Sequence, residues 1–502
     1  MSVNQPVPHP QPPAPTSIPY GPDVREVRLP ERTRIVASNP PLEPLPDFER
    51  SVREALARPL GHEPLDNLVG PGARVTIAFD DPAGPAYPHP AGWQDPRQAV
   101  ITLILAELER LGVARSDTRL LCANALHRKW TQSELASILG TRIAYGFGPA
   151  HLFCHDGEDR ENLVHLGETE RGMEVELSRW ALDSDQLIYV GLPKSLFNGG
   201  WKSTCVGLSS FRSIAYHHRP WPFARGHSVE DLHTSSFHKI MGELGGVLER
   251  ELDRRGRRVF QIEIPTNNAI PPRPTGVFTG RVEDVHAETA RLLERQLVVP
   301  LEGQSDVVVY GLDDRFETYS KFSQVNPILV LYMGLFHALG RYQGNPLVRP
   351  GGILVLHHPC PPLFDELHFP SYPELFNRVL PAVRDANEGW ELFADEFAHR
   401  PEYVHRYRHG YGYHGAHPFF LWGRQPTALK HLSKIYLAGA TDPETARRLG
   451  FEPFETLEAA IAAAESELGR DCSISLLQSP PIPVPRVSVA GGDGGGVEIR
   501  PA

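Results

Sequence analysis

The sequence lacks several features whose absence limits its class. Its 502 residues include only five cysteines, scattered and with no Cys-x-x-Cys pair, which predicts reduced thiols in the cytoplasm rather than a disulfide framework. No apolar run reaches the roughly 18 residues of a membrane span, and the proline-rich start has no secretory signal. Long basic runs are missing and the net charge is −11, so neither a nucleic-acid nor a membrane partner is expected.

Lysine is also scarce, because only seven of the 50 basic residues are lysine, and each one is therefore conspicuous. Histidine is plentiful, with 23 residues, which favours metal or acid–base chemistry but also fits a compositional drift of the genome. Hydrophobic residues make up 41% and charged residues 22%, as in globular proteins, and the length is too great for one core.

The alternation of apolar and amphipathic segments predicts two α/β domains with mostly parallel sheets and an active-site cleft between them. The first 45 residues are rich in proline, which disfavours helices and central strands, so 1–45 is predicted to be an extended arm. Residues 46–268 are predicted to form an N-terminal α/β domain that holds most candidate site residues. Residues 269–485 form a second α/β domain whose end can pack back on the first, and 486–502 form a disordered tail.

Polar clusters follow four of the predicted strands. In open parallel sheets, ligands bind beyond the carboxyl ends of the strands, so each cluster is a candidate for a functional site. The clusters are Asp80-Asp81, His127-Arg128, the segment from Lys194 to Lys202, and His357-His358.

The loop after the strand Leu187–Gly191 gives the strongest signal. Two of the seven lysines, Lys194 and Lys202, lie eight residues apart around an Asn-Gly-Gly turn. Gly199 and Gly200 let the backbone approach a ligand, and their N–H groups can cradle an anion. A lysine beside such a turn can be a phosphate clamp, a Schiff-base nucleophile or an ordinary surface charge.

Two histidine motifs allow different interpretations. His127 lies between a predicted strand and a helix that starts with a capping box, where it suits either a general base or a structural role. Further along, four histidines offer an i,i+4 pair that can bind zinc as in a hydrolase. They lack the glutamate of an HExxH motif, so a solvated or interface segment is preferred. The four are His405, His409, His414 and His417.

In this order, the motifs resemble the nickel-dependent lactate racemase family, whose members carry a nickel-pincer nucleotide. The resemblance covers roughly residues 40–485. It rests on the following stretches: Asp80-Asp81, Ala123–Arg128, His155–Thr169, Gly199–Lys202, His218 and Lys434–Pro480.

The resemblance implies that the cofactor is nickel pyridinium-3,5-bisthiocarboxylic acid mononucleotide. Lys202 matches the lysine that can bind it covalently, and His218 matches the ligand that completes the nickel coordination. Asp81, Gly199 and Gly200 are assigned to the same cofactor-binding set. The ring of His217, the neighbour of His218, is expected to point elsewhere.

The resemblance also assigns residues to the substrate. His127 matches an acid–base histidine, whereas Lys194 stands where the second one is expected and can transfer a proton or hold a substrate anion. Arg128 and Tyr332 are assigned to substrate binding. The family's carboxylate-binding arginine is replaced by Gly84, so lactate is not the expected substrate.

The sequence therefore predicts an isomerase, a racemase or epimerase of a 2-hydroxy acid or related secondary alcohol, which removes and returns hydride. A one-sided alcohol oxidoreductase with the same cofactor and a non-catalytic relative are the alternatives. The expected partners are a small hydroxy substrate and the proteins that synthesise the cofactor, all in the cytoplasm.

Overall fold

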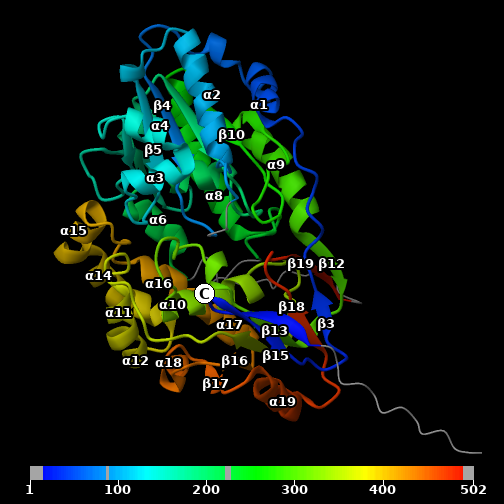
Figure 1. Ribbon diagram of the computed structural model, residues 1–502. Coiled ribbons are helices and arrows are strands. Elements are labelled where there is room, and N and C mark those ends of the chain that lie inside the picture. The colour runs from blue at the N-terminus through cyan, green and yellow to red at the C-terminus, as the bar shows by residue number, and fades with distance from the viewer. Residues whose placement is uncertain (1–14, 86–89, 221–227, 490–502) are drawn as a thin grey trace, which may run out of the picture.

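The computed structural model describes residues 15–85, 90–220 and 228–489, which form two lobes, each built on a six-stranded sheet (Figure 1). We call residues 48–297 the N lobe, and residues 16–36 together with 298–488 the C lobe. The predicted α/β class with mostly parallel sheets is confirmed. Within the described residues no helix is both long and apolar enough to cross a membrane.

The sheet of the N lobe has the order β11-β10-β9-β4-β5-β6, and every neighbouring pair is parallel except β10 and β11. Its strands are β4 (Val75–Asp80), β5 (Thr118–Ala123), β6 (Leu152–Cys154), β9 (Gln186–Gly191), β10 (Val259–Glu263) and β11 (Phe278–Gly280). The central strands are buried on both faces, which explains their nearly continuous apolar runs. Around the sheet lie the hairpin of β7 (Leu163–Glu168) and β8 (Glu174–Ser178), and the helices α1 (Phe48–Ala57), α2 (Pro96–Arg110), α3 (Gln132–Leu139), α4 (Thr141–Gly146), α5 (Arg179–Leu182), α6 (Phe211–His218), α8 (Ser236–Arg254) and α9 (Val282–Leu297).

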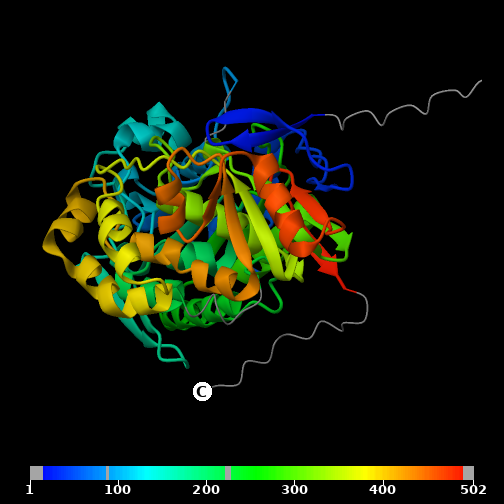
Figure 2. The same cartoon turned by 90° about the horizontal axis from the view of Figure 1, so that it is seen from below.

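The sheet of the C lobe is parallel throughout, in the order β17-β16-β15-β13-β18-β3. Seen from below, its strands lie between helices, and the yellow and gold helices of residues 372–409 gather on one side (Figure 2). The strands are β3 (Arg34–Val36), β13 (Ser305–Gly311), β15 (Val348–His357), β16 (Lys434–Ala438), β17 (Glu452–Phe454) and β18 (Ile474–Leu477). The helices are α10 (Pro327–Tyr332), α11 (Tyr372–Glu374), α12 (Leu380–Ala382), α13 (Ala386–Gly389), α14 (Asp395–His399), α15 (Pro401–His409), α16 (His417–Trp422), α17 (Gln425–His431), α18 (Pro443–Arg448) and α19 (Leu457–Leu468).

Two smaller sheets complete the C lobe. One is a hairpin near the N-terminus, and the other has the order β12-β19-β14. Their strands are β1 (Thr16–Tyr20), β2 (Asp23–Val27), β12 (Val298–Glu302), β14 (Gln343–Gly344) and β19 (Val484–Ser488).

The predicted domain boundaries shift at three places. The boundary at residue 268 falls inside the N lobe, because β11 pairs with β10 and the proline-rich segment before it turns back on itself through Thr266 and Pro274. The predicted arm contributes three strands, and β3 takes an edge position, where fewer ladder hydrogen bonds are needed near proline. The predicted tail begins inside β19, and residues 1–14 and 490–502 lie outside the described residues.

The docking of β1 on the C lobe gives a stability prediction. A Cβ atom at Gly311 would lie 2.4 Å from Ile18 Cγ2 and 2.6 Å from the Pro19 carbonyl oxygen. Gly311→Ala should therefore cost about 1–3 kcal/mol of unfolding free energy and expose the N-terminal strands to protease. The matched control is Gly242→Ala, an exposed site in α8 with no atom within 4 Å, which should gain up to about 1 kcal/mol. Thermal unfolding and limited proteolysis measure both, and wild-type behaviour of Gly311→Ala would contradict the prediction.

Candidate active site

A cavity of about 300 Å³ is lined by side chains from both lobes. Six of the nine predicted site residues line it: Asp81, His127, Lys194, Lys202, His218 and Tyr332. The C lobe adds residues that the sequence did not place in this site, among them Tyr319, Phe336, Arg341, Phe420, Arg424 and His417, the last from the C-terminal histidine cluster. Six of the predicted residues therefore share one cavity with side chains of the C lobe.

Arg97 fixes the loop at the end of β4. Its buried guanidinium pairs with Asp95 at 2.7 Å and donates to the carbonyl oxygens of Asp80 at 2.7 Å and Asp81 at 2.8 Å. Burial disfavours its charge, but the Asp95 carboxylate outweighs this and raises the pKa of Arg97 above its usual range. The arginine therefore stays charged and holds the backbone that carries both aspartates.

Asp81 orients His127 toward the cavity. Burial acts to raise the pKa of Asp81, but the imidazole of His127 and the indole N–H of Trp130 outweigh it and lower that pKa. Asp81 Oδ2 lies 2.8 Å from His127 Nδ1 and 3.1 Å from Trp130 Nε1. An ionised carboxylate only accepts hydrogen bonds, so His127 carries its proton on Nδ1 and presents the Nε2 lone pair.

The loop that carries His127 is held from the C lobe. Ala125 has a φ of 49°, a left-handed conformation that is unfavourable for a residue with a Cβ. Its carbonyl oxygen accepts from the Tyr407 hydroxyl at 2.8 Å, and the Leu126 carbonyl oxygen accepts from the backbone of His414 at 3.1 Å. The position of His127 therefore depends on contact between the lobes.

Lys194 occupies the space beside Gly84. Gly84 has a φ of +134°, and a Cβ placed there would lie 3.1 Å from Lys194 Nζ. Burial, together with nearby Arg97 and Lys321, lowers the pKa of Lys194 to about 8. An arginine at position 84 would meet this ammonium group directly, so the glycine and the lysine form a matched pair.

Lys202 and His218 meet in the same cavity. Lys202 starts a π-helical turn, Lys202–Val206, and its Nζ lies 2.8 Å from Asn198 Oδ1. Burial lowers its pKa, against the opposing effect of Asp80 and Asp81. An amine with a lowered pKa is a better nucleophile at neutral pH.

The rings of His217 and His218 are hydrogen-bonded to each other rather than divergent. Their Nδ1 atoms lie 2.7 Å apart at the end of α6, so the expectation that His217 points elsewhere is wrong. Burial lowers the pKa of both rings, that of His217 to about 3, and keeps them neutral. Because Nδ1 of His218 is engaged by its neighbour, Nε2 is the nitrogen suited to bind a metal.

Gly199 and Gly200 are not among the residues that line the cavity. The N–H of Gly199 donates to Ser203 Oγ at 3.0 Å, and that of Gly200 donates to Glu263 Oε1 at 2.6 Å. A Cβ at Gly199 would lie 2.8 Å from Glu263 Oε1 and from His286 Nδ1. The turn therefore makes room for a buried ion pair, and its N–H groups are already used within the protein.

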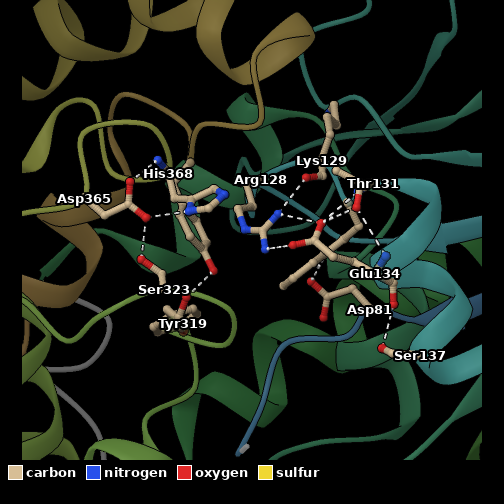
Figure 3. A network of polar contacts seen from close by, with 12 residues as sticks. Asp81, Arg128, Lys129, Thr131, Glu134, Ser137, Tyr319, Ser323, Asp365 and His368 are labelled. Carbon is tan, nitrogen blue, oxygen red and sulfur yellow. Dashed lines mark hydrogen bonds and ion pairs between the residues drawn. The ribbon is translucent and has the colours of Figure 1, made fainter.

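The structure contradicts the assignment of Arg128 to the substrate. Arg128 is fully buried, stacks on Trp130 at 4.0 Å and pairs with both carboxylate oxygens of Glu134 at 2.6 and 3.0 Å. Figure 3 shows its guanidinium directed at Glu134, on the helix whose N-terminus Thr131 caps. Glu134 of the capping box thus neutralises Arg128, the residue that follows His127.

The four C-terminal histidines do not converge on a metal. His405 and His409 are exposed, His414 Nε2 bonds Glu158 at 3.0 Å, and only His417 lines the cavity. In the part of the chain that the structure describes, a single group of three histidine, cysteine or carboxylate side chains has ligand atoms close enough to hold a metal ion, and it lies on the hairpin of β7 and β8. It comprises His165, Glu174 and Glu176, and Arg212 lies against both glutamates.

The loop that carries Tyr319 is fixed by two carboxylates. Buried Glu317 accepts from the backbone N–H groups of Tyr319 and Ser320. Asp365 accepts from the hydroxyl of Ser323 at 2.6 Å and contacts His368, as Figure 3 shows. This loop brings the Tyr319 ring to within 5.2 Å of the His127 ring, measured between centroids.

Comparison with known proteins connects the N-terminal part to one family. Residues 20–227 match the family model of the lactate racemase N-terminal domain. The lactate racemase of Lactiplantibacillus plantarum is 26% identical over 174 residues, and that of Thermoanaerobacterium thermosaccharolyticum is 24% identical over 174 residues. Each match covers 34% of this chain and 38% of the relative, so it spans well under half the length of these curated relatives.

Solved structures extend the likeness to the whole fold. The structure of the lactate racemase apoprotein from Thermoanaerobacterium thermosaccharolyticum has a TM-score of 0.67 at 18% identity, covering 94% of this chain and 100% of that chain. A protein from Thermotoga maritima has a TM-score of 0.51 at 13% identity and covers 90% of this chain and 100% of its own. At these identities the similarity establishes the fold alone.

Glu317 predicts a pH dependence of stability. Burial raises the pKa of Glu317 to about 7, although neighbouring backbone N–H groups oppose the shift. The folded state binds this proton more tightly than the unfolded state, so stability falls as the pH rises toward 7 and stays lower above it. Glu317→Gln should therefore gain roughly 1–3 kcal/mol of unfolding free energy at pH 8 and almost nothing at pH 4.

Urea unfolding at several pH values measures this difference. The control is the exposed Glu455→Gln, which should leave the pH profile of stability unchanged. An equal gain for Glu317→Gln at both pH values would show that ionisation is not the cause.

Proposed function

We propose, on the premise that residues 20–227 belong to the lactate racemase N-terminal domain family, that this protein is a racemase or epimerase acting on a 2-hydroxy acid or related secondary alcohol other than lactate. The observation that carries the proposal is a single cavity in which His127, Lys202 and His218 meet. These are a hydrogen-bond-oriented base, an amine and a neutral imidazole, three groups that the reaction requires.

The donor set fits a nickel-pincer nucleotide, the cofactor that the sequence motifs imply. His218 would bind the nickel through Nε2, since a neutral imidazole suits nickel and the other ring nitrogen is held by His217. Lys202 would hold the nucleotide, covalently or by charge. When bound, the group accepts a hydride from the substrate carbon and returns it. The enzyme therefore needs a host whose proteins make this nucleotide.

His127 would take and return the proton of the substrate hydroxyl. Its Nε2 lone pair faces the cavity because Asp81 holds the proton on Nδ1. The same carboxylate stabilises the imidazolium that forms when the proton arrives. Asp81 thus acts on the base, rather than directly on the cofactor as the sequence motifs suggested.

Lys194 would hold the anionic group of the substrate. It lines the cavity beside Gly84, where an arginine side chain would otherwise start. The lining from the C lobe includes the Tyr332 and Phe336 rings, stacked at 5.1 Å, and Phe420. A lysine in place of arginine and these aromatic rings favour a hydroxy acid larger and more apolar than lactate.

Retention of the cofactor should depend on Lys202 and on the two histidines of α6. In holoenzyme from a host that makes the nucleotide, Lys202→Ala should lose any mass adduct on the chain. His218→Ala should lose most of the nickel, and His217→Phe should weaken nickel binding about 10- to 100-fold, because the ring orientation of His218 is no longer fixed. The measurements are intact mass and metal analysis, with the exposed His409→Gln as control. An adduct that persists on Lys202→Ala, or full nickel in His218→Ala, would refute the assignment.

The substrate preference is tested on nickel-loaded enzyme with L-lactate beside larger 2-hydroxy acids and neutral polyols. Lactate should be a poor substrate, and Lys194→Met should raise KM for the preferred acid about 10- to 100-fold, because a hydrogen bond to a charged group contributes about 1.5–3 kcal/mol. His127→Ala should keep nickel but lose about 10²–10⁴-fold in kcat. Lactate racemisation that equals the best larger acid would show that the substrate assignment is wrong.

A further inference from the structure

We propose that His417 is a catalytic residue of this cavity, which holds the reacting oxygen of the substrate as a neutral hydrogen-bond donor beside His127. The inference rests on the proposed function, which it deepens by adding a second group at the reacting oxygen. In the sequence, His417 is the last member of the C-terminal histidine cluster, whose other members do not line the cavity.

His417 comes from the opposite lobe to His127, yet the two rings touch. It is the first residue of α16, is 4% exposed and lines the same cavity. Its ring centroid lies 5.7 Å from that of His127, 4.9 Å from Tyr319 and 4.7 Å from Tyr413. The aromatic rings around it restrict its orientation. Two imidazoles at this separation can both reach one oxygen atom.

The two rings have different partners at Nδ1. His127 Nδ1 faces the Asp81 carboxylate, which can only accept, whereas His417 Nδ1 lies 2.6 Å from the hydroxyl of Tyr372. Tyr372 is fully buried, and a buried hydroxyl that fails to donate its proton is costly. Among the described hydrogen bonds that hydroxyl has His417 Nδ1 as its partner, so it donates there. His417 then carries its own proton on Nε2.

Burial keeps His417 in the neutral form. Its pKa lies well below the usual range, first because of burial and then because of the nearby His127 and His414. A neutral imidazole with the proton on Nε2 is a donor that does not lose its proton during the reaction. Neutral histidines polarise carbonyl oxygens in this way in other enzymes. His127 and His417 therefore present opposite hydrogen-bonding groups, an acceptor and a donor.

An acceptor and a donor at one oxygen suit a secondary alcohol that is oxidised to a ketone and then reduced again. The hydroxyl donates to His127 Nε2 and accepts from His417 Nε2–H. When the O–H bond breaks, its proton forms an N–H bond on His127. The nickel-pincer nucleotide of the proposed function, which Lys202 and His218 would hold, would supply the acceptor for the hydride of the adjacent carbon. The carbonyl oxygen then accepts from both rings, and the same proton returns from His127 when the hydride returns. Only one proton moves, and His417 keeps its own throughout.

The test compares four variants of nickel-loaded enzyme on the best hydroxy acid found. His417→Leu removes the donor and should lower kcat about 10²–10³-fold, the usual effect of losing one donor to a developing charge. His417→Gln keeps an N–H donor and should recover part of the rate. Tyr372→Phe removes only the hydroxyl that fixes the tautomer and should cost about tenfold. The exposed His409→Gln is the control.

Three further readouts separate this role from others. Nickel content and any Lys202 adduct should stay at wild-type values in all four variants. The pH profile of kcat should keep its shape in His417→Gln, because His417 does not titrate in the reaction. In ¹⁵N NMR spectra, the signal lost in His417→Gln should have the shift of an imidazole protonated at Nε2.

The outcomes distinguish a failure of the proposed function from a failure of the role of His417. If the wild-type enzyme with full nickel turns over no hydroxy compound, the proposed function fails and this inference fails with it. If the wild type is active and His417→Leu matches it, only the inference fails. Loss of nickel in His417→Leu, or equal loss of rate in the Leu and Gln variants, would also overturn the donor role.

Discussion

The buried guanidinium of Arg97 is the constraint on which the site depends. A buried cation is costly unless it is fully paired. The Arg97 guanidinium donates hydrogen bonds to the Asp95 carboxylate and to the carbonyl oxygens of Asp80 and Asp81. The backbone at the end of β4 therefore has one arrangement. This backbone fixes the position of Asp81, and the hydrogen bond to Asp81 fixes the orientation of the His127 ring. The ion pair of Arg97 and Asp95 thus sets the orientation of the His127 ring.

The two lobes contribute unlike surfaces to one cavity. The N lobe supplies Asp81, His127, Lys194 and Lys202 to the lining, whereas the C lobe supplies several aromatic rings together with Arg341 and Arg424. The lobes are joined by hydrogen bonds beside the cavity. The Gly84 N–H donates to the carbonyl oxygen of Thr318 at 2.9 Å, and the Tyr407 hydroxyl donates to the loop before His127. The geometry of the cavity therefore depends on the contact between the two lobes.

Local patterns in the sequence predicted much of the fold and part of the site. The apolar runs of β4 and β9 and the capping box at Thr131 are confirmed, because each depends on neighbouring residues. The same Glu134 that marks the start of the helix also pairs with Arg128, six residues before it, so the arginine assigned to the substrate is already neutralised. His417 was beyond reach for a different reason. Its partner His127 lies 290 positions away on the other lobe, and no local pattern encodes that contact.

The order of strands along the chain determines how this molecule can be made. The N lobe is one continuous stretch, 48–297, and its sheet is complete once that stretch has left the ribosome. The C-lobe sheet contains β3, which precedes this stretch, and β18, its neighbour, which comes more than 430 residues later. The N lobe can therefore fold during synthesis, whereas β3 has to wait unpaired until β18 has been synthesised. Until the C lobe has folded, its aromatic side chains do not cover the site. The histidine and lysine side chains of the N lobe then face solvent, where a large ligand can reach them.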